Sequence, residues 1–123
     1  MTDRVQNEST EAVLQRHLDA FAKHDMEATL ADYAKSATVV TADGIFQGRE
    51  EIRGFFEWAF SQLPEGSPFV LDQQFIKDDV AFITWHAESA SMRIPLGSDT
   101  FVIRDDRIQM QSVTAYMEAK AGA

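Results

Sequence analysis

Asp99 is an acidic residue on the apolar face of a predicted strand. Residues 98–116 are rich in β-branched and aromatic types around a two-Asp turn, a pattern typical of a β-hairpin. Alternate strand side chains share a face, so Asp99 faces the same way as Phe101 and Ile103. A buried carboxylate must be paired or have a raised pKa. One interpretation is a pocket acid, base or ligand anchor; the other is a carboxylate that caps a turn at the sheet edge.

His17 is the second ionisable side chain on a predicted apolar face. It lies three residues after Leu14 and four before Phe21, on one stripe of a predicted helix. A lone imidazole there is either a satisfied core residue or a pocket group. Direct pairing of His17 with Asp99 would relieve the burial of both and would allow proton transfer near neutral pH. We therefore take both as catalytic candidates.

Further polar and aromatic side chains fall on predicted inward faces. Gln73 is the polar member of an alternating apolar strand, and Trp85 shares one face of the strand 80–91 with Ile83. Tyr33 follows a short helix and either packs that helix on the sheet or lines a pocket. Apolar walls with few convergent polar groups are typical of small-molecule sites.

Composition excludes several other chemistries. The chain has no Cys, so disulfides, thiolate metal sites and Cys nucleophiles are excluded, and its net charge of -9 argues against a nucleic-acid partner. His86 and Glu88 lack a third metal ligand, so a solvated or dimer-facing pair is the better interpretation. There is no Gly-x-Ser-x-Gly elbow and no phosphate-binding glycine loop. We expect no metal and no cofactor.

The 123 residues predict one soluble domain, with 9–117 folded and 1–8 and 118–123 flexible. The first residues lack the apolar core of a signal peptide, and no apolar run could span a membrane. We therefore expect a cytoplasmic protein without a membrane partner.

Helical and strand patterns are segregated along the chain. Helices are predicted from a Ser9 or Thr10 cap to about residue 24, over a short segment capped by Asp25, and over 49–63. A short strand is predicted at 38–41, and from residue 69 onward the pattern is β, with Pro95 and Gly97 in a connection. This order indicates an α+β fold rather than a doubly wound one.

The chain resembles the nuclear transport factor 2-like superfamily, closest to the branch of ketosteroid isomerases and SnoaL-like polyketide cyclases. The resemblance covers roughly residues 9–117 and implies a cone-shaped α+β barrel. The implied barrel is a strongly curved, mixed, mostly antiparallel sheet under three N-terminal helices, usually in a homodimer packed through the outer sheet face. The matching residues are Ala20-Phe21, Asp25, Tyr33-Ala34, Ala37-Thr38-Val39, Gly48-Arg49-Glu50-Glu51-Ile52, Phe55-Phe56, Thr100-Phe101-Val102-Ile103-Arg104 and Arg107-Ile108.

The isomerase residues implied by this resemblance are only partly present. His17 stands where the isomerases place an oxyanion-binding Tyr, and Thr41 where they place the Asp base. Asp99 matches their second, protonated carboxylic acid. Steroid isomerisation by that mechanism is therefore not expected, while Asp99 matches the pocket acid of the cyclases. The candidate ligand-binding residues are Tyr33, Thr41, Phe56, Phe60, Gln73, Ile83, Trp85 and Phe101.

Three functions remain open from the sequence. The first is cofactor-free acid/base chemistry (isomerisation, cyclisation or hydration) on a small apolar or polyketide-like molecule, with Asp99 as acid/base and His17 as its partner. The second is a non-catalytic module that binds a hydrophobic ligand. The third is a structural homodimer with an incidental cavity.

Overall fold

A single curled sheet and three helices make up the fold in the computed structural model, which describes residues 2–121. The elements, in chain order, are α1 (Thr2–Ala22), α2 (Met26–Ala31), β1 (Tyr33–Thr41), β2 (Gly44–Gln47), α3 (Gly48–Gln62), β3 (Phe69–Lys77), β4 (Val80–Glu88), β5 (Met92–Arg104) and β6 (Arg107–Ala119). The α+β class expected from the sequence is confirmed.

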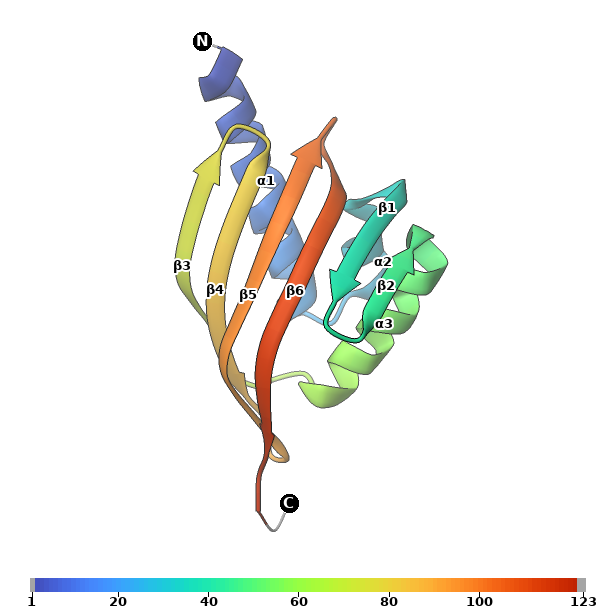
Figure 1. The fold of residues 1–123 in the computed structure, drawn as a ribbon, viewed down its shortest axis with the longest axis vertical. Coiled ribbons are helices and arrows are strands. Elements are labelled where there is room, and N and C mark those ends of the chain that lie inside the picture. Colours follow the sequence, from blue (N-terminus) through green and yellow to red (C-terminus); the bar gives the residue numbers. More distant parts are fainter. Residues whose placement is uncertain (1, 122–123) are drawn as a thin grey trace.

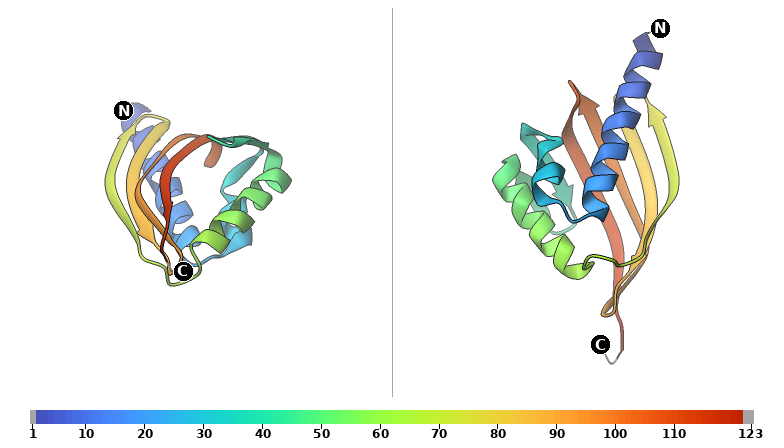
Figure 2. Two further views of the ribbon diagram at one scale, coloured as in Figure 1. Left: turned by 60° about the horizontal axis from the view of Figure 1, so that its bottom comes forward. Right: turned by 180° about the vertical axis from the view of Figure 1, so that it is seen from behind.

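The sheet has the strand order β2-β1-β6-β5-β4-β3, and all neighbours are antiparallel except the parallel pair β1 and β6 (Figure 1). It curls strongly but does not close, because β2 and β3 remain edges (Figure 2). The expected barrel is therefore an open one. Helix α1 lies across β3 to β5 and α3 across β1 and β2, which encloses the core on the concave face.

Helix α1 begins at Thr2 rather than at the predicted cap near Ser9. Ser9 and Thr10 therefore lie inside the helix, and their hydroxyls bond to residues outside it. Ser9 donates to Asp106 Oδ1 (2.8 Å) and Thr10 to the carbonyl of Asp78 (2.6 Å). These bonds fasten α1 to the β5–β6 and β3–β4 turns. The helix thereby presents His17 to the sheet. The short helix α2 does begin at the predicted cap, since the Asp25 side chain accepts from Ala28 N.

The predicted hairpin at the end of the chain is confirmed, and its turn residues Asp105 and Asp106 both have positive φ. Two consecutive positive φ angles match the right-handed twist of the flanking strands. Along β5 the buried residues alternate, so Asp99, Phe101 and Ile103 share the inner face as expected.

Gln73 was predicted to face the interior and does not. A β-bulge between Leu71 and Gln73 shifts the pairing with β4 by one residue. A shift of one residue exchanges the two faces of a strand. Gln73 therefore lies on the outer face, where it accepts a hydrogen bond from Thr84 (3.0 Å), and Phe75 is 63% exposed.

Pro95 and Gly97 lie within β5 rather than in a connection. The strand accommodates them because its pairing is irregular there, with register shifts between Trp85 and Ala87 and between Arg93 and Leu96. No helix in the described part of the chain is long and apolar enough to cross a membrane.

Candidate functional site

The cavity that contains Asp99, called the main cavity below, lies between α1, α3 and the concave face of the sheet and has a volume of about 90 Å³. Its walls are aromatic and aliphatic apart from a few polar side chains. The residues that line it are His17, Leu18, Phe21, Phe55, Phe56, Trp58, Ala59, Gln62, Leu63, Phe69, Ile83, Trp85, Ile94, Asp99, Phe101, Gln111, Val113, Ala115 and Met117. Asp99 is the acidic member of this lining.

Asp99 is held by one neighbour on each adjacent strand. Trp85 on β4 donates its indole N–H to Oδ1 (2.8 Å), and Gln111 on β6 donates its amide to Oδ2 (2.8 Å). The cross-strand partners of Asp99 are Ile83 and Val113, so both donors are diagonal neighbours on the same face. The polar side chains of Trp85, Asp99 and Gln111 thus meet on one wall of the cavity.

The pKa of Asp99 is raised from 3.8 to about 6. Burial in the apolar cavity is the main cause, because it penalises the charged carboxylate. The hydrogen bonds from Trp85 and Gln111 and the charge of His17 act in the opposite direction. At neutral pH the carboxyl is therefore ionised, and it can take up a proton close to that pH.

Gly97 makes room for the Trp85 indole. The two residues are cross-strand partners, and a Cβ atom at position 97 would lie 2.2 Å from the Trp85 ring. Only glycine leaves room for the ring at this position, where its N–H reaches Asp99. The stacking of Phe69 on Trp85, with ring centroids 5.1 Å apart, holds the other side of the indole.

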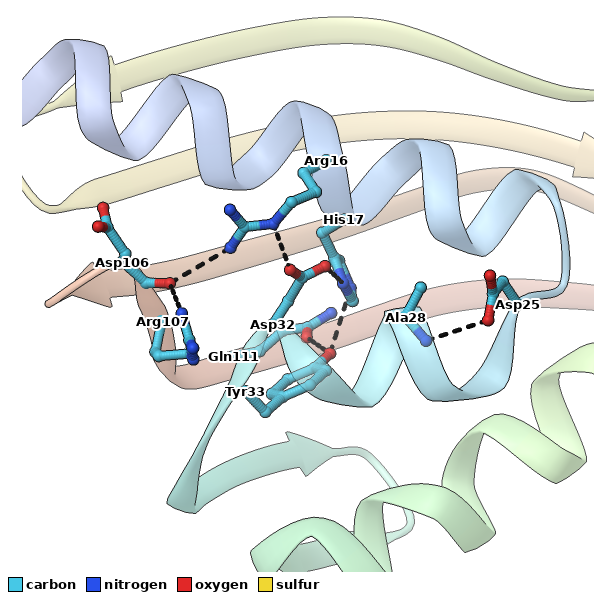
Figure 3. A network of polar contacts seen from close by, with 9 residues as sticks. All are labelled: Arg16, His17, Asp25, Ala28, Asp32, Tyr33, Asp106, Arg107 and Gln111. Carbon is cyan, nitrogen blue, oxygen red and sulfur yellow. Dashed lines mark hydrogen bonds and ion pairs between the residues drawn. The ribbon is translucent and has the colours of Figure 1, made fainter.

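His17 does not pair directly with Asp99. Its Nε2 lies 3.3 Å from the Tyr33 hydroxyl and its Nδ1 3.4 Å from Asp32 Oδ2 (Figure 3). Neither Tyr33 nor Asp32 lines the cavity. Tyr33 in turn donates to Gln111 Oε1. His17 and Asp99 are thus connected through Tyr33 and Gln111. The predicted direct contact is replaced by a buried network.

Asp32 closes the far end of this network near the surface. Its Oδ1 accepts from Arg16 Nε (2.6 Å), and Arg16 also donates to the carbonyl of Asp106 (3.3 Å; Figure 3). Burial would raise the pKa of Asp32, but the contacts with His17 and Arg16 outweigh burial and lower it. The pKa of Tyr33 is well above its usual value because of burial and the charges of Asp99 and Asp32, so Tyr33 remains a donor.

A second hollow of about 290 Å³ adjoins the cavity between α3 and the β1–β2 turn. It shares a wall with the first, formed by Phe55 and Trp58 on α3 and by inner residues of β6. Thr41 and Phe46 line only this hollow. Trp58 is 46% exposed and lies between the two spaces. A ligand larger than the inner cavity would extend past Trp58.

The predicted site residues fall into five positions. Those that line the main cavity are His17, Phe56, Ile83, Trp85, Asp99 and Phe101. Tyr33 is fully buried behind its wall, and Thr41 lines the second hollow. Phe60 packs against Phe21 and stacks on His24 with ring centroids 4.3 Å apart. Gln73 lies on the outer face of the sheet.

Two polar residues of the site were not identified from the sequence. Gln111 had a usable signal, because it shares strand parity with the inward Val113, Ala115 and Met117. Asp32 had no such signal in the sequence. Its position depends on contacts with Arg16 and His17 in α1, and the whole of α2 lies between them and Asp32 in the chain.

The described residues contain no group of three His, Cys, Asp or Glu side chains that could hold a metal ion. His86, considered above with Glu88, instead contacts Asp72 (Nδ1 to Oδ2, 2.8 Å) on the outer face of the sheet. The cavity therefore offers carboxylate, amide and imidazole groups without an assembled metal centre among the described residues.

Solved structures of low sequence identity share this fold. A candidate ketosteroid isomerase from Kribbella flavida aligns with a TM-score of 0.76 at 14% identity, over 95% of this chain and 84% of its own. A candidate polyketide cyclase from Sinorhizobium meliloti aligns with a TM-score of 0.69 at 18% identity, over 83% and 93%. A SnoaL-like protein of unknown function from Burkholderia thailandensis has a TM-score of 0.73 at 17% identity, over 89% and 96%.

Sequence comparison gives the family. No curated protein matches the sequence. The family model of the SnoaL-like domain matches residues 14–110, which include α1 from Leu14 onward and every strand as far as Met110 in β6. The match agrees with the superfamily expected from the sequence, and it agrees with the observed architecture. The chain therefore belongs to the SnoaL-like domain family.

Proposed function

We propose that this protein is a cofactor-independent acid/base enzyme that binds a small apolar molecule in the main cavity and uses Asp99 as its general base. One observation carries the proposal: a buried carboxylate lies in the wall of an apolar cavity, held by N–H donors on both oxygens, with a pKa of about 6. A base with a pKa near the working pH combines a sufficient ionised fraction with useful proton affinity.

The role proposed for Asp99 differs from the one that the resemblance implied. A protonated oxyanion donor needs acceptors around it, whereas both oxygens of Asp99 receive N–H donors. These partners favour the carboxylate form. Asp99 is therefore suited to remove a proton and to return it at another atom of the substrate.

The reaction class follows from a single base in an apolar wall. Asp99 takes a proton from a carbon next to a carbonyl group, and the electron pair of the broken C–H bond passes toward the carbonyl oxygen. Return of the proton to another carbon isomerises the substrate. Attack of the enolate carbon on a second carbonyl cyclises it, and Asp99 then returns the proton to the alkoxide oxygen formed from that carbonyl. The apolar walls favour a compact ring or short alkyl ketone.

Hydrogen exchange tests the proposal with a small ketone. We expect the wild-type protein to catalyse exchange of the α-hydrogens of 2-indanone in D2O, measured by NMR, with a rate that rises as pH increases through about 6. Asp99→Asn should bind the ketone and lose the exchange. Binding without exchange by the wild-type protein, or equal exchange by both proteins, would contradict a general base at Asp99.

A non-catalytic binding module is the second candidate, and the position of His17 favours it. Nε2 of His17 contacts the Tyr33 hydroxyl and Nδ1 faces Asp32, so neither is directed at Asp99, and Thr41 lies in the second hollow. Beside Asp99, therefore, neither residue supplies the oxyanion donor or the Asp base of the isomerases. A pure binder would show saturable binding of 2-indanone that is insensitive to pH between about 5 and 8.

We further propose a homodimer that packs through the outer sheet face. Large hydrophobic residues are exposed on this face, on the outward positions of β3 to β6: Val70, Phe75, Val80, Phe82, Leu96, Met110 and Tyr116. So many exposed large hydrophobic residues on one face support an interface between protein chains.

A further inference from the structure

A continuous chain of buried polar contacts runs from the cavity to the surface side of α1. Gln111 Nε2 lies 2.8 Å from Asp99 Oδ2, and Gln111 Oε1 accepts from the Tyr33 hydroxyl. His17 Nε2 lies 3.3 Å from the Tyr33 oxygen, and His17 Nδ1 lies 3.4 Å from Asp32 Oδ2 (Figure 3). All five residues are buried. Because these residues have little access to water, their polar groups depend mainly on one another for hydrogen bonds.

The direction of the hydrogen bonds is set by Asp99. A carboxylate there only accepts, so Gln111 presents its NH2 to Asp99 and its carbonyl to Tyr33. The single hydroxyl hydrogen of Tyr33 is then used, and its oxygen accepts from Nε2 of His17. Nδ1 of His17 and Oδ2 of Asp32 are buried 3.4 Å apart without a hydrogen-bond partner, and a hydrogen on Nδ1 would satisfy both atoms. In this state His17 is doubly protonated.

Protonation of Asp99 reverses the same chain. The new O–H of Asp99 donates to the carbonyl of a flipped Gln111 amide, whose NH2 then donates to the Tyr33 oxygen. The Tyr33 hydroxyl then donates to Nε2 of His17, which carries no hydrogen in this state. The hydrogen on Nδ1 of His17 stays directed at Asp32. When the two ends share one proton, that proton therefore lies either on Asp99 or on Nε2 of His17.

The two ends are therefore coupled. A chain reversed at only one end would place donor against donor or acceptor against acceptor in a buried site, which is as costly as leaving a polar group unpaired. The charged or ionisable groups around the network are Arg16 and Asp32 at His17, and Tyr33 between the two ends. The cavity lining in the described residues adds no further ionisable group beyond His17 and Asp99.

We propose that Tyr33 and Gln111 form a reversible hydrogen-bond relay through which protons on Asp99 and on His17 exclude each other. In this arrangement His17, Tyr33 and Gln111 are positioning residues. The relay lets a buried carboxyl gain and release a proton with every neighbour satisfied in both states. Its use in turnover rests on the proposed function, but the coupling itself is a property of the free protein.

The test uses the free protein at neutral pH and reads the protonation of both His17 nitrogens from their 15N chemical shifts. Asn at position 99 can donate to Gln111 and so imitates the protonated carboxyl, with its own carbonyl still accepting from Trp85. We expect both nitrogens protonated in the wild type. In Asp99→Asn we expect Nε2 to be bare and the proton to remain on Nδ1.

The charge of Asp99 could also act on His17 directly through space. The relay differs from that direct effect because it requires the side chains of Gln111 and Tyr33. In a Gln111→Met background, and separately in a Tyr33→Phe background, Asp99→Asn should change the His17 shifts much less than in the wild type. Tyr33→Phe keeps the ring and serves if Gln111→Met does not fold. Equal changes in the wild type and in the folded background, or no change in the wild type, would overturn the relay. Because no ligand is present, these outcomes are independent of the 2-indanone test.

Discussion

At the scale of single residues, the site depends on how Asp99 is held. Its carboxyl lies among apolar side chains and is 9% exposed, yet each oxygen has an N–H donor. The sequence predicted this residue and its face, because strand parity is a local property. It did not predict the partners of His17, because Tyr33 and Asp32 reach it through the packing of α1 on the start of β1, which no local pattern encodes.

The raised pKa of Asp99 makes folding stability depend on pH. The folded state holds this proton more tightly than the unfolded chain, so its contribution is full below about 3.8 and is lost as pH rises through about 6. The shift corresponds to about 3 kcal/mol. We expect Asp99→Asn, which cannot ionise, to gain that order of stability relative to wild type between pH 4 and pH 7.5. Urea denaturation measures it; a stability difference that does not change with pH would contradict a buried, proton-retaining carboxyl.

Gly97 provides a second prediction at this scale. In Gly97→Ala the new methyl group would overlap the Trp85 ring, so the indole must move and its N–H leaves Asp99. We expect a loss of about 1–3 kcal/mol in the free energy of unfolding. Since the lost hydrogen bond had lowered the pKa of Asp99, that pKa should rise further, as followed by 13C NMR of the carboxyl.

Gly54→Ala is the matched control for Gly97→Ala. Gly54 lies within α3, and a Cβ atom there meets nothing within 4 Å. Alanine in a helix interior is favoured over glycine by about 1 kcal/mol, so this variant should be at least as stable as wild type. If the two variants behave alike, the Trp85 ring does not depend on the space at position 97.

At the scale of elements, two local irregularities limited the prediction from sequence. The bulge in β3 exchanges the faces of Gln73 and Phe75, and the strict alternation assumed for that strand cannot reveal an inserted residue. Pro95 and Gly97 are ordinary signals of a connection, but β5 continues through them because its neighbours shift register at the same place. By contrast, α3 and the last hairpin follow their patterns closely, since continuous periodicity and turn chemistry agree there.

The attachment of α1 to the turns can be tested with two hydroxyl deletions. Thr10 is fully buried and donates to the carbonyl of Asp78, so Thr10→Val keeps the shape but removes that donor. We expect a loss of about 1–3 kcal/mol, measured by urea denaturation. Ser9→Ala removes the exposed bond to Asp106 and should cost less than about 1 kcal/mol. Equal costs would show that burial of the Thr10 contact does not stabilise the helix position.

At the scale of the whole molecule, the two faces of the sheet differ in what covers them. The concave face carries the cavity and the network of Asp99, whereas the convex face carries exposed hydrophobic residues without helices over it (Figure 2). The net charge of -9 keeps separate molecules apart unless a specific apolar contact overcomes the repulsion. A convex face buried in a homodimer leaves both cavities open, because α1 and α3 lie on the opposite side.

A charge in the centre of the convex face should therefore separate the subunits. Phe82 lies on β4 opposite Thr100 and beside Phe75, and its side chain is 37% exposed. In Phe82→Glu each subunit would bury a new carboxylate against its symmetry mate, which costs several kcal/mol unless it is paired. We expect a dimeric mass for the wild type and a monomeric mass for the variant in light scattering after size exclusion. Ile45→Glu, which alters an exposed hydrophobic residue on the edge strand β2, should leave the dimer intact. Wild-type protein that is monomeric, or a Phe82→Glu variant that remains dimeric, would exclude this face as the interface.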